Sequence, residues 1–331
     1  MKICADVGGT NLRIAYVNDE HQIVFKEKYS ISNFPGADVG FVAALNAFLR
    51  EKKELLETDK INSITVSESG HIKDDRVQFT NTDWVILKSD LSDNFSSMFN
   101  PNLEIFLIND FEALAYGLST IEEGDFTDIF PREGYGDTKL VCGPGTGLGL
   151  AALKTIGPNI ENLIAIPSEG GHQSFSVETS LEKEIREHMM EGWMSYEDVL
   201  SGNGLKMLFN FFNQKNHIPS SYDIAPKEII DLSNSGNIPA RKALEEFSYA
   251  LGTFCGNMVL ALGATKGVYL WGGILKSFPL ELLKVQMKRR FQQRGSAVNF
   301  LSDVPIFKIT NDEIALRGCS IYSVINSKGD L

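Results

Sequence analysis

Residues 2–17 read KICADVGGTNLRIAYV: an apolar run, a glycine turn and a second apolar run. The two runs have the alternation of short β-strands. Between them, glycines remove the Cβ atoms that would keep the backbone N–H groups away from an anion. Residues 138–154, TKLVCGPGTGLGLAALK, repeat this order of strand, glycine turn and strand. The repeat predicts two related halves, each with a turn suited to part of one polyphosphate.

Neither glycine turn matches the best-known nucleotide-binding loops. No Lys followed by Ser or Thr stands at the spacing of a Walker P-loop. The second turn also departs from the dinucleotide fingerprint G-x-G-x-x-G, and a strand rather than a helix is expected after it. A pair of tight β-hairpins without a ligand is the alternative. In the first turn, Asp6 could hold Mg²⁺ through water while the amides of Gly8, Gly9 and Thr10 hold phosphate oxygens.

The composition is that of a globular enzyme with an acidic balance. The 331 residues suffice for two domains with separate cores, and 43% of them are hydrophobic and 22% charged. The formal net charge of −12 argues against nucleic acid or an anionic membrane surface as a partner, because both favour basic footprints. An acidic protein that binds ATP has to concentrate backbone donors or a metal ion locally, as the glycine turns would.

The cysteines and the apolar runs predict a cytoplasmic protein. Cys4, Cys142, Cys255 and Cys319 are widely spaced, which is typical of reduced thiols and argues against a cysteine zinc cluster. An acidic residue stands too near the N-terminus for a signal peptide. No apolar run approaches the ~18 residues of a membrane span, so no membrane association is expected.

Apolar periodicity predicts strands that alternate with helices, and therefore an α/β fold. One strong strand is expected at 103–108, in addition to those that flank the glycine turns. Residues 240–262 predict one long helix, in which Gly252 and Gly256 let a neighbour approach closely. The acidic, glycine-containing segment 118–138 is expected to be a loop or a surface excursion.

Asn109 and Asp110 stand where the strand 103–108 meets a helix. Ligands of open α/β sheets gather at the carboxyl ends of strands. A carboxylate there can take the proton of a substrate hydroxyl, as phosphoryl transfer to that hydroxyl requires. Helix capping is the alternative, since Asn and Asp are both favoured at N-caps. The two roles can coexist, with Asn109 capping or binding and Asp110 acting as the base.

A second polar cluster, PSEGGH at 167–172, places Glu169 and His172 on a glycine-rich turn. A carboxylate and an imidazole suit a sugar, whose hydroxyls both donate and accept hydrogen bonds. A zinc site and a plain loop are the alternatives, although no other histidine stands at ligand spacing from His172. Further along the chain, Glu197 and Asp198 have the pattern of a solvated helix face.

Taken together, these residues resemble the bacterial-type glucokinases of the hexokinase, actin and Hsp70 superfamily. The matching motifs follow the family's order from residue 3 to about 320, and this order makes the resemblance specific. They are Asp6-Val7-Gly8-Gly9-Thr10-Asn11, Thr80-Asn81-x-x-Trp84, Ile108-Asn109-Asp110-Phe111-x-Ala113, Gly143-x-Gly145-Thr146-Gly147-Leu148-Gly149, Glu169-Gly170-Gly171-His172, Glu197-x-Val199-Leu200-Ser201-Gly202-x-Gly204-Leu205 and Gly272-Gly273-Ile274.

The resemblance implies a two-domain α/β fold of the actin-like (ribonuclease H-like) ATPase type, with a cleft between the domains. Residues 1–109 with about 312–331 would form a small α/β domain, and residues 110–311 a large one. The resemblance also implies a homodimer that acts in glycolysis.

The implied reaction is ATP-dependent phosphorylation of glucose at its 6-hydroxyl, with Mg²⁺ and without zinc. By motif position, Asp110 would be the base, and Asn109, Glu169, His172 and Glu197 would bind sugar hydroxyls. The role of Glu197 rests on the resemblance alone. The residues that would bind ATP are Ala5, Asp6, Val7, Gly8, Gly9, Thr10, Gly145, Thr146, Gly272 and Gly273. A kinase for another hexose, such as fructose or mannose, and a non-catalytic sugar-sensing protein on the same scaffold are the alternatives.

Two segments distinguish this chain from related patterns. Related repressor and ROK-type sugar kinases carry a cysteine-rich zinc motif after Glu-Gly-Gly-His, whereas Gln173-Ser174-Phe175 follows here, so the chain resembles the zinc-free group. The family's Gly-Pro-x-x-Gly segment on the sugar side is replaced by Gly70-His71-Ile72-Lys73-Asp74. His71 and Asp74 thus stand where proline and glycine are usual, which bears on hexose specificity. A variation in a surface β-turn is the expected meaning.

Overall fold

The computed structural model describes the chain apart from residues 38, 57–59, 79–83, 190–191, 220–222 and 328–331. Thr80 and Asn81 of the second motif therefore lie outside the described residues. The chain separates into two compact units. The first contains Met1–Ile121, Thr155–Ala165 and Asp312–Leu331, and the second contains Glu122–Lys154 and Ile166–Asn311. The predicted domains differ in assigning 110–121 and 155–165 to the large domain, and their boundaries stay a prediction.

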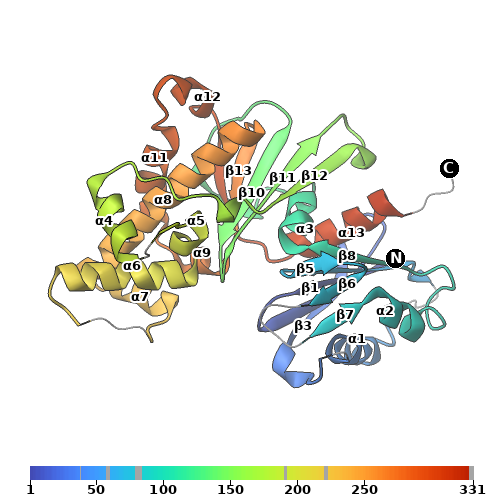
Figure 1. Cartoon of the computed structure of the whole chain (residues 1–331). Helices are drawn as coiled ribbons and strands as arrows, with labels where there is room; N and C mark the ends of the chain where they lie inside the picture. Colours follow the sequence, from blue (N-terminus) through green and yellow to red (C-terminus); the bar gives the residue numbers. More distant parts are fainter. Residues whose placement is uncertain (38, 57–59, 79–83, 190–191, 220–222, 328–331) are drawn as a thin grey trace. The chain divides into compact units, whose positions relative to one another are not determined.

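The first unit is built on a five-stranded sheet in the order β3-β2-β1-β4-β8 (Figure 1). Its strands are β1 (Lys2–Val7), β2 (Asn11–Val17), β3 (Ile23–Ser30), β4 (Ser63–Glu68) and β8 (Glu104–Asn109). β1 and β2 form the expected antiparallel hairpin around the first glycine turn, while β4 runs parallel to both β1 and β8. In register, Glu68 lies between Val7 and Asn109. The carboxyl ends of three parallel strands thus meet at one sheet edge.

Two helices far apart in the sequence pack closely in this unit. They are α3 (Asp110–Gly117) and α13 (Ile314–Asn326). A Cβ atom built on Gly318 would lie 1.8 Å from the carbonyl oxygen of Ala113, and one on Gly117 would lie 2.1 Å from that of Ile314. Glycine at both positions therefore lets the two helix backbones touch. The remaining helices of the unit are α1 (Gly40–Glu51) and α2 (Lys88–Phe95).

A small three-stranded sheet explains one departure from the family pattern. Strands β5 (His71–Lys73), β6 (Arg76–Gln78) and β7 (Val85–Leu87) pair antiparallel in that order. The two residues between β5 and β6, Asp74 and Asp75, have φ values of 52° and 60°. Positive φ at both positions is the pattern of a type I′ hairpin turn, which favours Gly, Asn and Asp. Asp74 thus keeps a conformation that glycine adopts more readily.

The second unit is built on a six-stranded sheet in the order β12-β11-β10-β13-β14-β9. Its strands are β9 (Phe126–Phe130), β10 (Thr138–Pro144), β11 (Leu148–Thr155), β12 (Leu163–Ser168), β13 (Gly267–Leu270) and β14 (Ile306–Ile309). β10 and β11 form the second hairpin, β10 and β13 run parallel, and β13 runs parallel to β14. The expectation of a loop throughout 118–138 is wrong, because β9 pairs with β14 inside this segment.

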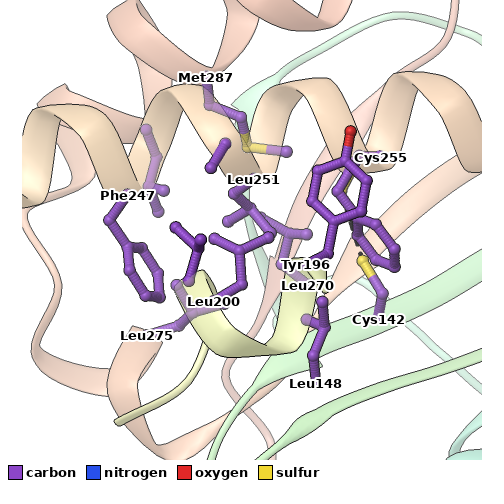
Figure 2. Close-up of a cluster of buried hydrophobic side chains, with 14 of the residues drawn as sticks. Cys142, Leu148, Tyr196, Leu200, Phe247, Leu251, Cys255, Leu270, Leu275 and Met287 are labelled. Atoms are coloured by element: carbon purple, nitrogen blue, oxygen red, sulfur yellow. Dashed lines mark hydrogen bonds between the residues drawn. The ribbon is translucent and has the colours of Figure 1, made fainter. Parts of the chain in front are cut away.

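The long helix α8 (Ile238–Leu262) organises the core of the second unit (Figure 1). It begins at the N-cap Asn237 and ends at Gly263 in the left-handed conformation. A Cβ on Gly252 would lie 2.2 Å from the carbonyl oxygen of Met287, so this glycine admits a close neighbour, as expected. Figure 2 shows α8 side chains packed against Tyr196, Leu148 and Leu270 from other elements.

The other helices of the second unit are short or of ordinary length. They are α4 (Ser180–Met189), α5 (Tyr196–Val199), α6 (Gly202–Lys215), α7 (Pro226–Asn234), α9 (Gly273–Ser277), α10 (Leu280–Leu282), α11 (Lys288–Gln292) and α12 (Val298–Leu301), with a π-helical segment at Leu283–Met287. Within the described residues, no helix is long and apolar enough to cross a membrane.

Candidate active site

Asp6 is held firmly at the end of β1. Its Oδ2 accepts a hydrogen bond from the Arg13 guanidinium at 2.8 Å, and its Oδ1 accepts one from the Ser67 hydroxyl at 3.2 Å. The side chain is only 15% exposed. Both oxygens are thus engaged by the protein, which fits a contact with Mg²⁺ through water better than a direct one.

Asn109 takes the capping role expected at the end of β8. The Asn109 Oδ1 accepts hydrogen bonds from the backbone N–H groups of Phe111 and Glu112, at 3.0 and 3.2 Å, and so caps α3. Its Nδ2 group has no hydrogen-bond partner within the described part of the chain, and it remains available to a ligand. The capping interpretation therefore holds for Asn109, while the Asp110 Oδ1 also accepts from the Phe111 N–H.

The pKa of Asp110 is raised from 3.8 to about 7. Burial is the largest cause, because it disfavours the charged carboxylate, and the nearby carboxylate of Asp6 adds to it. The Phe111 N–H donates to Asp110 Oδ1 at 2.8 Å and acts in the opposite direction, while Glu68 raises the pKa further. An aspartate carboxyl group in water titrates near pH 4. Asp110 is instead poised near neutral pH, where a general base works well.

Glu68 is a buried carboxyl group that the sequence did not single out. Its side chain is fully buried, and one oxygen accepts a hydrogen bond from the Gly70 N–H. The other oxygen, Oε1, has no partner among the described residues. Burial raises the pKa of Glu68 to about 7. Only its position in the sheet could have indicated Glu68 as a site residue. Glu68 ends β4, and β4 lies between β1, which carries Asp6 near its end, and β8, which ends at Asn109.

The first glycine turn leaves consecutive amides unused. The Gly8 N–H donates to the Asn11 carbonyl oxygen at 2.9 Å and closes the turn. In the described chain, no protein acceptor faces the amides of Gly9 and Thr10. Ala5 and Val7 are core residues with buried side chains, so their contribution to a phosphate site would be through the backbone alone. Adjacent unpaired amides of this kind form an anion-binding concavity.

The second glycine turn repeats this arrangement. The Gly145 N–H donates to the Gly147 carbonyl oxygen at 2.8 Å, and the Gly145 carbonyl oxygen accepts from the Gly202 N–H at 3.0 Å. Among the described residues, the amides of Thr146 and Gly147 have no hydrogen-bond acceptor. A Cβ atom on Gly145 would have no heavy atom within 4 Å. The protein itself therefore does not require glycine at position 145, whereas close approach of a ligand would.

Gly272 and Gly273 differ in what they do for the fold. Gly272 has a φ of 145°, and a Cβ on it would lie 2.2 Å from the carbonyl oxygen of Pro144. Its glycine is therefore required by packing against the second glycine turn. Gly273 has open space around its Cα, so only a ligand would limit a side chain there.

Three of the residues expected to bind sugar lie together in the second unit. His172 Nε2 is 3.8 Å from Glu169 Oε2, and His172 Nδ1 is 3.9 Å from Glu197 Oε1. Glu169 is 90% exposed and His172 57%, so both can contact a ligand. A β-bridge between Ser174 and Ser195 joins the two segments that carry them. The group offers acceptors and an imidazole to several hydroxyls at once.

Glu197 does more than the sequence indicated. Its Oε2 accepts a hydrogen bond from the backbone N–H of Leu148, in the second glycine turn, at 2.8 Å. The neighbouring Asp198 instead completes a capping box with Ser195, the N-cap residue of α5: the Asp198 Oδ2 accepts from the Ser195 N–H and hydroxyl, and the Ser195 Oγ accepts from the Asp198 N–H. Tyr196 is buried against α8 (Figure 2) and anchors the short helix. The pattern of a solvated helix face is thus wrong for both acidic residues.

No transition-metal centre is built from the described residues. Within them, no group of three or more His, Cys, Asp and Glu side chains is arranged to hold a metal ion. The four cysteines are buried free thiols, and the Sγ atoms of Cys142 and Cys255 lie 3.4 Å apart in the core (Figure 2).

Comparisons with known proteins find relatives over nearly the whole chain. The family model described as Glucokinase matches residues 3–325. A glucokinase of Erwinia tasmaniensis is 30% identical over 97% of this chain and 96% of its own length. A glucokinase of Colwellia psychrerythraea is 27% identical over the same shares.

Solved structures show the same fold. The crystal structure of a glucokinase from an Antarctic psychrotroph superposes with a TM-score of 0.81 at 26% identity, covering 97% of this chain and 98% of that one. A Balamuthia mandrillaris glucokinase in complex with glucose gives 0.76 at 21% identity, covering 97% and 92%. The fold expected from the motifs, the two-domain actin-like α/β type, is confirmed. With a family model that spans nearly all of its length, this chain belongs to the glucokinase family.

Proposed function

We propose that this chain transfers the γ-phosphoryl group of ATP to the 6-hydroxyl of glucose. The observation that carries the proposal is Asp110, a carboxylate at the carboxyl end of β8 with a pKa of about 7. Its position in the motif Ile108-Asn109-Asp110-Phe111 is that of the base in the family. Family membership supports the reaction, and the local environment of Asp110 supports its role.

The proposed reaction needs a proton acceptor and groups that bind the sugar. The glucose 6-oxygen forms a bond to the γ-phosphorus, the bond from that phosphorus to the β,γ-bridging oxygen breaks, and ADP leaves. The hydroxyl proton passes to Asp110 late in the transfer. Asn109 Nδ2, Glu169, His172 and Glu197 would bind the other hydroxyls of the sugar.

The two glycine turns would hold the nucleotide. The unpaired amides of Gly9 and Thr10, and those of Thr146 and Gly147, are suited to phosphate oxygens. Gly272 and Gly273 would lie by the adenosine. Mg²⁺ bound to the phosphates, with Asp6 contacting it through water, would neutralise charge on the transferred group.

A coupled assay tests the proposal. ADP formation is measured with glucose, fructose and mannose, with ATP and other nucleotides, and with and without Mg²⁺. We expect the highest kcat/KM with glucose and ATP, and no turnover without Mg²⁺. A preference for fructose or mannose would contradict the glucose assignment, and glucose binding without any ADP formation would indicate a sugar-sensing protein instead.

The resemblance to the family also leads us to propose a localisation, an oligomeric state and a pathway for this chain. We expect a cytoplasmic homodimer that acts in glycolysis and that has no nucleic acid partner. The acidic balance of the chain supports the last point, since its net charge is −12. Light scattering of the purified protein tests the oligomeric state.

A further inference from the structure

We infer that Glu197 couples sugar binding to nucleotide binding, because its two carboxylate oxygens face different sites. Oε1 faces His172 in the sugar cluster at 3.9 Å, and Oε2 accepts the Leu148 N–H of the second glycine turn at 2.8 Å. The inference rests on the proposed function, to which it adds a coupling between the affinities for the two ligands.

Glu197 lies directly against the backbone that would receive phosphate. A Cβ atom built on Gly147 would be 2.5 Å from Glu197 Oε2 and 3.1 Å from Cδ. The Gly147 amide is one of the two unpaired donors of the second turn, and Leu148 follows it. The Glu197 carboxylate therefore lies against Gly147, in the turn that we expect to hold the phosphates of the nucleotide.

The negative charge of Glu197 should weaken nucleotide binding when no sugar is bound. A carboxylate and a phosphate at this range repel each other, and the side chain is only 32% exposed, so water screens the repulsion incompletely. In the described chain, no Lys or Arg nitrogen lies within 4.0 Å of the Glu197 carboxylate. The ionisable side chain beside it is the imidazole of His172.

A bound sugar would remove this penalty. Hydroxyl groups that donate to Glu197 spread its negative charge and fix its orientation, while Oε2 keeps its hydrogen bond to Leu148. The turn then presents the Thr146 and Gly147 amides to phosphate with weaker repulsion. Glucose should therefore strengthen nucleotide binding, and by thermodynamic reciprocity the nucleotide should strengthen glucose binding by the same factor.

Glu197→Gln separates this charge effect from a structural role. The amide oxygen of glutamine can still accept from the Leu148 N–H, so the turn and the fold are retained while the charge is lost. Glu169→Gln is the matched control, because Glu169 is 90% exposed and makes no contact with the second glycine turn in the described structure. Both substitutions should weaken glucose binding.

The test is calorimetric titration with MgADP, with and without saturating glucose. For the wild-type protein and for Glu169→Gln, we expect glucose to lower the Kd of MgADP by about fivefold or more. For Glu197→Gln, we expect MgADP to bind about fivefold or more tightly than to the wild-type protein when glucose is absent, with less than about twofold further gain from glucose. A residue that only supported the turn would instead weaken MgADP binding when replaced.

Several outcomes would overturn the inference. They are an unchanged or weaker Kd of MgADP in Glu197→Gln without glucose, a wild-type Kd that glucose does not alter, and coupling that is lost equally in Glu169→Gln. The proposed function is decided separately, since a wild-type protein that forms no ADP with any hexose would fail the assay above. The titrations measure binding without turnover and still decide the coupling.

Discussion

At the scale of single residues, Asp110 can be tested by an isosteric change. We expect Asp110→Asn to lower kcat by about 10²- to 10⁴-fold, because the amide cannot accept the hydroxyl proton. The KM for glucose should change little, since other groups bind the sugar. Steady-state kinetics measure kcat and KM for the wild-type protein and for Asp110→Asn. Circular dichroism checks that the variant is folded. Turnover near that of the wild-type protein would remove Asp110 from the role of base.

The raised pKa of Asp110 also predicts a pH profile. Only the deprotonated carboxylate can act as the base, and half of it is protonated near pH 7 in the free protein. The kcat/KM for glucose should therefore rise with pH, through a midpoint of about 7, and level off above it. Initial rates from pH 5.5 to 8.5, at subsaturating glucose, measure this limb. A profile that is flat across this range would contradict the assignment.

A substitution at Gly145 can distinguish an effect on ATP binding from an effect on stability. A methyl group there meets no protein atom within 4 Å, so Gly145→Ala should leave the free energy of unfolding within about 0.5 kcal/mol of wild type. The same methyl group should obstruct the phosphates and raise the KM for ATP by about tenfold or more, with little effect on glucose. Urea denaturation and kinetics measure the two effects.

A second glycine of the same turn provides the control. A Cβ on Gly143 would lie 1.2 Å from the carbonyl oxygen of Trp271, so Gly143→Ala should destabilise or unfold the protein. An ATP KM that stays unchanged in a folded Gly145→Ala protein would show that the second turn does not hold phosphate.

At the scale of elements, the turn between β5 and β6 holds two aspartates in the left-handed conformation. Asp74 has a φ of 52°, which costs an L-residue free energy that glycine avoids. We expect Asp74→Gly to raise the free energy of unfolding by about 0.5 kcal/mol, after the larger entropy of glycine in the unfolded chain is counted. Asp74→Ala should lower it, because alanine lacks the polar side chain that tolerates this conformation. Urea denaturation of both variants and of the wild-type protein measures these changes. Equal free energies of unfolding for the three proteins would contradict the prediction.

Local patterns predicted some elements well and missed others. The two glycine hairpins, β8 and α8 carry strong signals, namely apolar runs bounded by glycine or by polar caps. β9 lies in an acidic segment and pairs with β14, about 180 residues away. Such a strand is stabilised by its partner rather than by its own sequence, and periodicity within 118–138 could not show it.

At the scale of the whole molecule, the site could be predicted only in part. Asp110, Glu169 and His172 have residue types and positions that indicate chemistry, so they could be selected before the fold was known. Glu197 could not, because its partner Leu148 is 49 residues away and contributes only a backbone N–H. Glu68 was missed because burial, rather than its local sequence, gives it an unusual environment.

Buried and partly buried carboxyl groups in both units predict how stability changes with pH. Burial raises the pKa values of Asp110 and Glu68 in the first unit and of Glu246 in the second to about 7. Unfolded carboxyl groups titrate near pH 4, so between about pH 4 and 7 the folded protein binds more protons than the unfolded chain. These groups therefore lower the free energy of unfolding as pH rises through this window, and their effect is constant above it.

Glu68→Gln tests this at one fully buried position. Glutamine cannot ionise, so the variant should lose less stability than the wild-type protein between pH 5 and pH 8, by about 1–3 kcal/mol. The comparison uses the change with pH within each protein, because the glutamine NH₂ group itself adds a buried donor at every pH. Urea denaturation at both pH values measures it, and Glu133→Gln, at an exposed carboxylate, should leave the pH dependence as it is. If Glu68→Gln and the wild-type protein lose equal stability over this range, Glu68 binds no more protons in the folded protein than in the unfolded chain, and its carboxylate is already ionised at pH 5.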